Sequence, residues 1–214
     1  MLGGTQFEDA QRILRSEQQA RKAGGSGELI IQEWLDGQQV STESVIVEGK
    51  ALFTAVAVRN YARLEEFAPY VIEDGSDTET GDRAQGSEIS RLVEAACAVL
   101  GWDNLTVKGD LVCHEGEWVI IELAARLSGG YFASAIIPAV YGVDVVGAAA
   151  ALAVERSFVL DGQKYSVACQ RYIFPDPADL GKRVVEVKAP KLNGEIVSAT
   201  LHLKPGDQIG RAHV

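Results

Sequence analysis

Apolar and polar residues follow two different periods along this chain, and turns rich in glycine separate them. Residues 6–23 and 87–100 carry apolar side chains every three or four positions, which predicts helices that bury one face. Runs rich in Val, Ile and Leu between polar turns predict β-strands. The strands are expected at 28–36, 42–48, 51–59, 164–174, 182–188 and 195–203, with a β-hairpin between 107 and 122.

Two alanine-rich segments, 131–142 and 144–155, predict further helices that are apolar enough to be buried. Asp144 is expected to cap the second of them at its N-terminus, and Ser87 to cap the helix at 87–100. Gly101 suits the C-terminal end of that helix. Strands joined by tight turns, with separate helices, predict an α+β class: an antiparallel sheet with flanking helices.

The stretch 60–86 is polar and only weakly periodic, and its acidic part at 73–86 contains three glycines. Such a segment is either an unstructured loop or a lid over a substrate. Arg59, just before it, could face an anionic substrate.

The composition excludes some functions. The chain has 214 residues, a net charge of −10 and no run of Lys or Arg, so nucleic-acid binding is not expected. Hydrophobic residues make up 47%, enough for a core, but no uninterrupted apolar run reaches the length of about 18 residues that spans a membrane. Three cysteines on apolar stretches predict buried free thiols, and with no apolar N-terminal signal segment a cytoplasmic location is expected.

The predicted hairpin and the loop after it gather charged residues among apolar neighbours. Asp110 lies in the first strand, Glu122 ends the second, Arg126 follows, and 128–130 reads Ser-Gly-Gly. Carboxylate oxygens bind hard cations such as Mg²⁺, and arginine binds phosphate through its fork of N–H groups. Asp110 and Glu122 are therefore candidate metal ligands, and Arg126 a candidate for phosphate oxygens.

The turn of the hairpin decides whether the two carboxylates share a face. A two-residue turn at 115–116 would place Asp110 and Glu122 on opposite faces, because side chains alternate along a strand. A three-residue loop at 115–117 brings them directly opposite each other and puts Trp118 on the carboxylate face. We predict the three-residue loop; the alternative is a surface hairpin with two solvated acids.

Glu-x-x-x-Arg-x-x-Gly-Gly after a β-hairpin, with an acid on the partner strand, resembles the metal-binding segment of the ATP-grasp superfamily. That superfamily includes biotin carboxylase, the carbamoyl phosphate synthetase large chain, D-alanine–D-alanine ligase and amino-acid ligases. The resemblance covers residues 5–175 as an order of segments and is most specific at ELAARLSGG. This chain departs from it at Ala124, where many members carry an Asn that bears on a second metal ion.

The resemblance implies a nucleotide-binding segment at 28–36, which looks like the strand on which the adenine lies. By position, the Gln32 side chain would face the exocyclic amine of the base. Glu33 would offer its backbone carbonyl and Leu35 its backbone N–H. Trp34 is either a residue that stacks on the base or an ordinary packing residue.

Three further positions follow from the same resemblance. The segment after Gly37 resembles Gly-x-Glu-x-Ser-x-Glu, in which Gln39 replaces the first Glu and Glu43 is retained, both as nucleotide-binding candidates. Arg171 corresponds to an arginine that reaches the active site in biotin-carboxylase-like members. A surface salt bridge is the alternative for Arg171.

The resemblance implies an ATP-grasp ligase that uses ATP and Mg²⁺, or Mn²⁺, to activate a carboxylate or bicarbonate as an acyl phosphate. An amine, a thiol or another nucleophile would then attack, and a homodimer is possible. The alternatives are a non-catalytic nucleotide-binding or assembly module and a purely structural α+β domain, although the last leaves the charged cluster unexplained.

Because no strand–loop–strand precedes residue 6, the chain looks like the back portion of the module, a fragment or a natural truncation that lacks the lobe covering the phosphates. We expect a partial ATP-grasp domain at 1–158 and a C-terminal β extension at 159–214, packed on the same domain. Alone, the chain is expected to bind ATP weakly and not to turn it over.

Overall fold

A computed structural model of the chain describes residues 13–18, 20–22, 24–67, 72–80, 83–162, 167–189, 191 and 198–210. The chain divides into two compact units, Met1–Asp36 and Gly37–Val214. None of the helices in the described residues is both long enough and apolar enough to cross a membrane.

The first unit contains the expected helix but not the expected strand. Residues 13–18 and 20–22 are helical, within the first predicted helix. The segment 28–36 forms no strand, and its apolar side chains are open to solvent: Ile30 is 89% and Trp34 58% exposed. The prediction of a buried strand is wrong here, because a strand needs a hydrogen-bonded neighbour and no described strand pairs with this segment.

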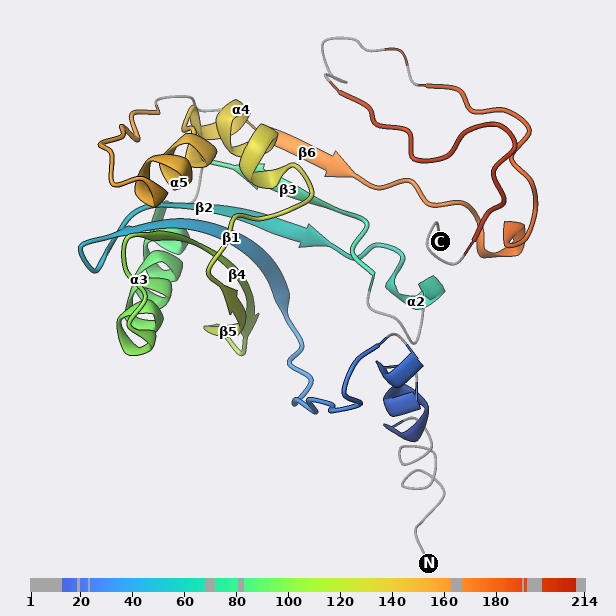
Figure 1. The fold of residues 1–214 in the computed structure, drawn as a ribbon, viewed down its shortest axis with the longest axis horizontal. Helices are drawn as coiled ribbons and strands as arrows, with labels where there is room; N and C mark the ends of the chain where they lie inside the picture. Colours follow the sequence, from blue (N-terminus) through green and yellow to red (C-terminus); the bar gives the residue numbers. More distant parts are fainter. Residues whose placement is uncertain are drawn as a thin grey trace, which may run out of the picture. The chain divides into compact units, whose positions relative to one another are not determined.

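The second unit is built on a six-stranded sheet with the order β5-β4-β1-β2-β3-β6, and every neighbouring pair is antiparallel (Figure 1). The predicted α+β class is therefore confirmed. The strands are β1 Gln38–Val47, β2 Lys50–Asn60, β3 Gly75–Glu79, β4 Leu105–His114, β5 Glu117–Ala124 and β6 Val167–Arg171. The helices are α2 Leu64–Phe67, α3 Arg83–Leu100, η1 Phe132–Ile136, α4 Ile137–Tyr141, α5 Val145–Ala153 and η2 Pro177–Asp179.

Helices cover both faces of the sheet, with α3 on one side and α4 and α5 on the other (Figure 1). One core cluster joins the sheet to α3, and its buried members are Val40, Ile46, Ile89, Val93, Cys97, Val107 and Leu111. The other joins the sheet to η1, α4 and α5, and its buried members are Val45, Ala55, Ala57, Phe132, Ala133, Ile137, Val143 and Val145. The predicted helices thus brace the sheet from both sides.

The two ends of α3 can be compared with the start and stop signals predicted from the sequence. Gly101 ends α3 as predicted: its φ is 69°, and the next residue, Trp102, donates its backbone N–H to the Cys97 carbonyl at 2.9 Å. Ser87 does not cap α3, because the helix already begins at Arg83. The start was predicted too late because the residues before Ser87 carry little apolar periodicity.

The hairpin between β4 and β5 turns at Glu115–Gly116, and both residues have positive φ, 50° and 88°. Two successive residues in that region make the tight two-residue turn that matches the twist of antiparallel strands. The predicted three-residue loop is therefore wrong. Trp118 consequently lies on the α3 side, packed against the core there, and not on the carboxylate face.

A β-bulge nevertheless brings the two carboxylates together. Leu111 pairs with Ile120, but the next pair is Asp110 with Glu122, so Ile121 is the extra residue. The bulge reverses the alternation that the two-residue turn would have imposed. The predicted pairing of Asp110 with Glu122 is thus confirmed, although through the bulge and not through a longer turn.

Part of the polar stretch expected to be a loop is a strand. β3 carries the sequence Gly-Ser-Asp-Thr-Glu, with no apolar side chain, and pairs with β2 on one side and β6 on the other. β3 forms a strand because it is hydrogen-bonded to a strand on each side, and not because its sequence has an apolar pattern. A hydrophobicity pattern alone could not have found it.

After β6 the described residues contain one isolated bridge, between Arg183 and Gln208, and no further strand. The strand predicted at 182–188 is therefore wrong. Of the one predicted at 195–203, the part at 198–203 is not a strand and 195–197 lies outside the described residues. The domain boundary at 158 stays a prediction; β6, which follows it, belongs to the main sheet.

The three cysteines are free thiols, as expected, but they differ in burial. Cys97 is buried, Cys113 is half-buried and Cys169 is exposed, so the expectation of three buried thiols is wrong for Cys169. Its strand, β6, lies at the edge of the sheet, and every second residue along it is exposed.

Asp144 caps α5 as predicted, since its carboxylate accepts the Gly147 backbone N–H at 2.8 Å. We expect Asp144→Ala to lower the free energy of unfolding by about 1 kcal/mol, the usual cost of losing an N-cap. Asp144→Asn keeps an acceptor in the same place and should cost much less. Urea unfolding monitored by circular dichroism measures both; equal losses in the two variants would show that the cap is not the cause.

Candidate functional site

Three charged side chains meet on the face of β4 and β5 that bears the carboxylates. Asp110 pairs with Glu122, and Lys108 pairs with Ala124 two positions along. The Lys108 ammonium contacts Asp110 Oδ2 and lies 3.9 Å from Glu122 Oε1. The Asp110 side chain is 14% exposed and that of Glu122 57%, so one carboxylate is held in the sheet and the other reaches solvent.

Groups from β1 and β2 fix Asp110 in place. The Ser41 hydroxyl donates to Asp110 Oδ1 at 3.1 Å, and an Arg59 guanidinium nitrogen lies 3.6 Å from Asp110 Oδ2. Arg59 also donates to Glu73 at 2.7 Å, so its charge is shared between two carboxylates. Asp110 therefore has a defined position beside two cations, as a preorganised site requires.

The same face continues toward Gln39, one of the candidate nucleotide-binding residues. The Tyr61 hydroxyl donates to Gln39 Oε1 at 2.8 Å, and the Arg59 guanidinium lies over the Tyr61 ring, 5.5 Å from its centre. Burial raises the pKa of the Tyr61 phenol, and the Arg59 charge opposes that rise. Gln39 thus positions a tyrosine beside the charged cluster in this structure.

Glu43, in the middle of β1, holds the loop that follows β5. Its side chain is fully buried, and Oε2 accepts the Ser128 backbone N–H at 2.7 Å. Among the described residues Oε1 has no hydrogen-bond partner. Burial raises the pKa of the Glu43 carboxyl above its ordinary value of 4.5, and the Ser128 N–H and the Arg126 charge oppose the rise.

Arg126 stands where this loop leaves the sheet. Its backbone carbonyl accepts the Lys108 N–H at 3.1 Å, and its own N–H donates to the Ala124 carbonyl at 2.8 Å. The side chain is exposed, and its guanidinium donates to the Leu127 carbonyl at 3.2 Å. The backbone is thus tied to the carboxylate strands while most of the guanidinium's N–H groups face outward.

A cavity of about 190 Å³ lies directly against Asp110. The Gln170 side chain of β6 donates to the Gly130 carbonyl at 2.7 Å, which fixes the loop from the opposite side. The polar and glycine residues that line the cavity are Ser41, Arg59, Glu73, Ser76, Lys108, Asp110, Ser128, Gly129, Gly130, Gln170 and Tyr172. Carboxylates, cations and backbone amides therefore converge on one hollow.

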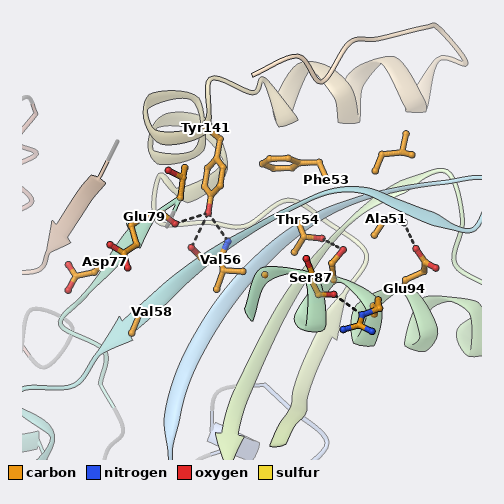
Figure 2. A pocket seen from close by; sticks show the side chains of 15 residues that line it. Ala51, Phe53, Thr54, Val56, Val58, Asp77, Glu79, Ser87, Glu94 and Tyr141 are labelled. Carbon is orange, nitrogen blue, oxygen red and sulfur yellow. Dashed lines mark hydrogen bonds between the residues drawn. The ribbon is translucent and has the colours of Figure 1, made fainter. Parts of the chain in front are cut away.

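A larger hollow of about 570 Å³ lies elsewhere, along β2 and α3, and Figure 2 shows it from close by. There the Tyr141 hydroxyl accepts the Val56 backbone N–H at 3.3 Å and donates to the Glu79 carbonyl at 3.4 Å. Glu94 accepts the Ala51 N–H at 2.9 Å. These polar groups bond to the backbone of β2 and β3, so we place the candidate site at the smaller cavity, beside Asp110.

Asp110 and Glu122 are the two carboxylates that were predicted to bind a metal ion, and they pair across β4 and β5. Among the residues that the structure describes, no group of three or more His, Cys, Asp or Glu side chains could hold a metal. Mg²⁺ is commonly bound through one or two carboxylates, with water and phosphate oxygens completing its shell. Two carboxylates are donors of that kind; Asp110 lines the cavity, and Glu122 is more than half exposed to solvent.

The remaining predicted site residues are Gln32, Glu33, Leu35 and Arg171. Gln32, Glu33 and Leu35 belong to the first unit, where Gln32 and Glu33 are exposed. Arg171 pairs with Asp77, its guanidinium lying 2.6 Å from one carboxylate oxygen and 3.0 Å from the other. The cavity beside Asp110 is lined by the two neighbours of Arg171 and not by Arg171 itself, as the alternative of a surface salt bridge predicts.

Lys108 was not among the site residues predicted from the sequence. A residue two positions before Asp110 on the same strand faces the same side, so the alternation rule was enough to place an ammonium beside the candidate metal ligand. Glu73 and Tyr172 could not be found in this way, because they come from segments far away in sequence.

Comparisons with known proteins bear on the fold. No protein-family model and no curated protein matches the chain. Among solved structures, the chain is similar to phosphoribosylglycinamide synthetase from Anaerococcus prevotii, with a TM-score of 0.67 and 16% identity over 84% of this chain and 45% of that one. It is also similar to L-amino acid ligase from Bacillus licheniformis, with a TM-score of 0.57 and 17% identity over 72% of this chain and 39% of that one.

Biotin carboxylase from Campylobacter jejuni, solved in complex with β,γ-ATP, has a TM-score of 0.58 and 12% identity over 92% of this chain and 44% of that one. The chain therefore spans less than half the length of each of these three proteins. At such low identity the likeness concerns the fold. The chain shares its fold with these three proteins, as expected from the resemblance of β5 and its loop to ATP-grasp enzymes.

The buried Glu43 carboxyl makes a prediction about pH. Its pKa is raised in the folded chain, so the native state binds more protons than the unfolded state between the ordinary and the raised value. The free energy of unfolding should therefore fall as pH rises from about 4.5 through that interval. Glu43→Gln removes the titration and keeps an acceptor for Ser128.

Urea unfolding of the wild type and Glu43→Gln across this pH range measures the effect. The free energy of unfolding of the wild type minus that of Glu43→Gln should decline with rising pH and then become constant. A difference that grows with pH would mean that hydrogen bonding and the Arg126 charge outweigh burial.

Proposed function

We propose that this chain is the metal- and phosphate-binding portion of an ATP-grasp ligase. Such an enzyme would use ATP and Mg²⁺, or Mn²⁺, to convert a carboxylate or bicarbonate into an acyl phosphate, which an amine or another nucleophile attacks. The observation that carries the proposal is the direct pairing of Asp110 with Glu122 beside the loop 128–130. The ATP-grasp fold supports it, because three similar structures are two ligases or synthetases and a biotin carboxylase.

Asp110 and Glu122 would hold the metal ion, whose chemical contribution is to neutralise charge on the phosphate oxygens. Asp110 is the fixed ligand, since Ser41 and Arg59 orient it. Glu122, more than half exposed, can adjust to the incoming ion. Asp110 would thus fix the position of the metal ion, and the exposed Glu122 would let the ion enter from solvent.

Arg126 and the loop 128–130 would face the phosphate oxygens. The exposed guanidinium has N–H groups available for an anion, and the Ser-Gly-Gly backbone leaves room for a phosphate to approach closely. Glu43 would act through the loop, holding Ser128 in place from inside the sheet. Arg59 and Lys108 would bind the acidic substrate or its phosphorylated form in the adjoining cavity.

The second candidate is a nucleotide-binding or assembly module without catalysis. Gln39 favours it, because Gln39 replaces a carboxylate of the resembling motif and is bonded to Tyr61 in this structure. The two candidates share the metal site and differ only in turnover. We propose further that Gln32, Glu33 and Leu35 contact the adenine.

A paramagnetic titration tests the metal site even if binding is weak. In NMR spectra, Mn²⁺ with ATP should broaden the backbone amide signals of residues near 108–110, 122–124 and 128–130. Only residues close to the ion are affected, because paramagnetic relaxation falls steeply with distance from it. Asp110→Asn with Glu122→Gln should abolish this broadening. Glu115→Gln with Glu117→Gln removes the same charge from the exposed turn of the same hairpin and should leave the broadening unchanged. Equal broadening in both double variants would place the metal elsewhere.

Arg126→Ala should weaken ATP binding in the same titration, and lower the turnover of the complete enzyme, with little loss of stability. The exposed Arg126 side chain forms no salt bridge among the described residues and acts on the Glu43 carboxyl only through its charge, so its loss should change the free energy of unfolding by no more than about 0.5 kcal/mol. Arg156→Ala, also exposed, is the matched control. A large loss of stability with unchanged nucleotide binding would make Arg126 a structural residue.

A further inference from the structure

The ammonium of Lys108 already occupies the space between the two carboxylates. It contacts Asp110 Oδ2 and lies 3.9 Å from Glu122 Oε1, and its side chain is only 15% exposed. Lysine is seldom so buried unless it is paired with a charge of opposite sign. The pair of carboxylates therefore carries an internal cation where a metal ion would bind.

The residue opposite Lys108 makes this arrangement possible. Lys108 pairs with Ala124 across the two strands, and the diagonal neighbour on the same face is Glu122. A long side chain reaches such a diagonal neighbour when the residue directly opposite is small. Ala124 thus leaves the space through which the lysine side chain extends to the second carboxylate.

We propose that Lys108 is the resident counter-cation of the carboxylate pair and has to leave it when a divalent cation binds. The inference rests on the proposed function and deepens it. An ammonium and a metal ion within a few ångströms repel each other strongly in a site partly shielded from water. Lys108 therefore lowers the affinity of the pair for a metal ion that arrives alone.

The displaced ammonium has a place to go. Lys108 lines the cavity of about 190 Å³ together with Arg59 and the loop 128–130, a setting that suits an anion. A phosphate or carboxylate group bound there would take up the ammonium that the metal displaces. The metal ion and the anion therefore favour each other's binding, which is a coupling between two neighbouring sites.

Calorimetric titration with Mn²⁺ alone tests the proposal. Lys108→Met removes the ammonium and keeps an unbranched side chain, so we expect it to bind Mn²⁺ about tenfold or more tightly than the wild type, a gain of 1.4 kcal/mol or more. Lys50→Met is the matched control: Lys50 also pairs with a carboxylate, Glu94 at 2.9 Å, but is 71% exposed and lies far along the sheet. Its Mn²⁺ affinity should equal that of the wild type.

A second measurement on the wild type requires no substitution. Lysine acetylation by an activated ester, followed by mass spectrometry, reports how available each ammonium is. Saturating Mn²⁺ should raise the rate at Lys108 several-fold and leave the rate at Lys50 unchanged. An unchanged rate at Lys108 would overturn the proposal even if Lys108→Met did not fold.

The outcomes separate this inference from the function on which it rests. If the wild type and Lys108→Met bind Mn²⁺ equally, and Asp110→Asn with Glu122→Gln abolishes binding, the metal site stands and the role of Lys108 is wrong. If neither protein binds Mn²⁺ and the acetylation rate of Lys108 does not change, the proposed metal site and the proposed role of Lys108 are both wrong.

Discussion

The hydrogen bond from the Ser128 backbone to the buried Glu43 carboxylate is the interaction on which the site depends. A carboxyl group with no exposed surface costs stability unless it is bonded, and here one oxygen accepts a backbone N–H at 2.7 Å. This hydrogen bond fixes the loop 128–130 to β1, beside the paired carboxylates. Arg126, two residues before Ser128, is thereby held at the same place.

A second constraint is the single extra residue in β5. Without the bulge at Ile121, the two-residue turn would put Asp110 and Glu122 on opposite faces, and no shared ion could contact both. With it, Trp118 and Ile120 pack against the α3 side while Glu122 returns to the side of Asp110. One strand thus supplies core residues in its first half and a site residue in its second.

Much of this could be predicted from the sequence because it depends on local signals. The strands β1, β2, β4 and β5, the cap at Asp144 and the end of α3 at Gly101 all follow from periodicity or from single residues. The pairing of Asp110 with Glu122 was predicted for the wrong reason, since bulges leave little trace in a sequence. β3 and the Glu43–Ser128 bond depend on partners far along the chain, which no local pattern reveals.

The charges on this face have to be considered together with the ligand. Lys108 and Arg59 lie among Asp110, Glu122 and Glu73, so two cations nearly balance three carboxylates, and the balance keeps partly buried charges stable. A divalent cation added alone would leave an excess of positive charge beside the partly buried Asp110 and Lys108 side chains. An anion added alone would face three carboxylates. Under the proposed function, this balance would favour a metal ion and an anionic group bound together, which is the form in which a metal–nucleotide complex presents them.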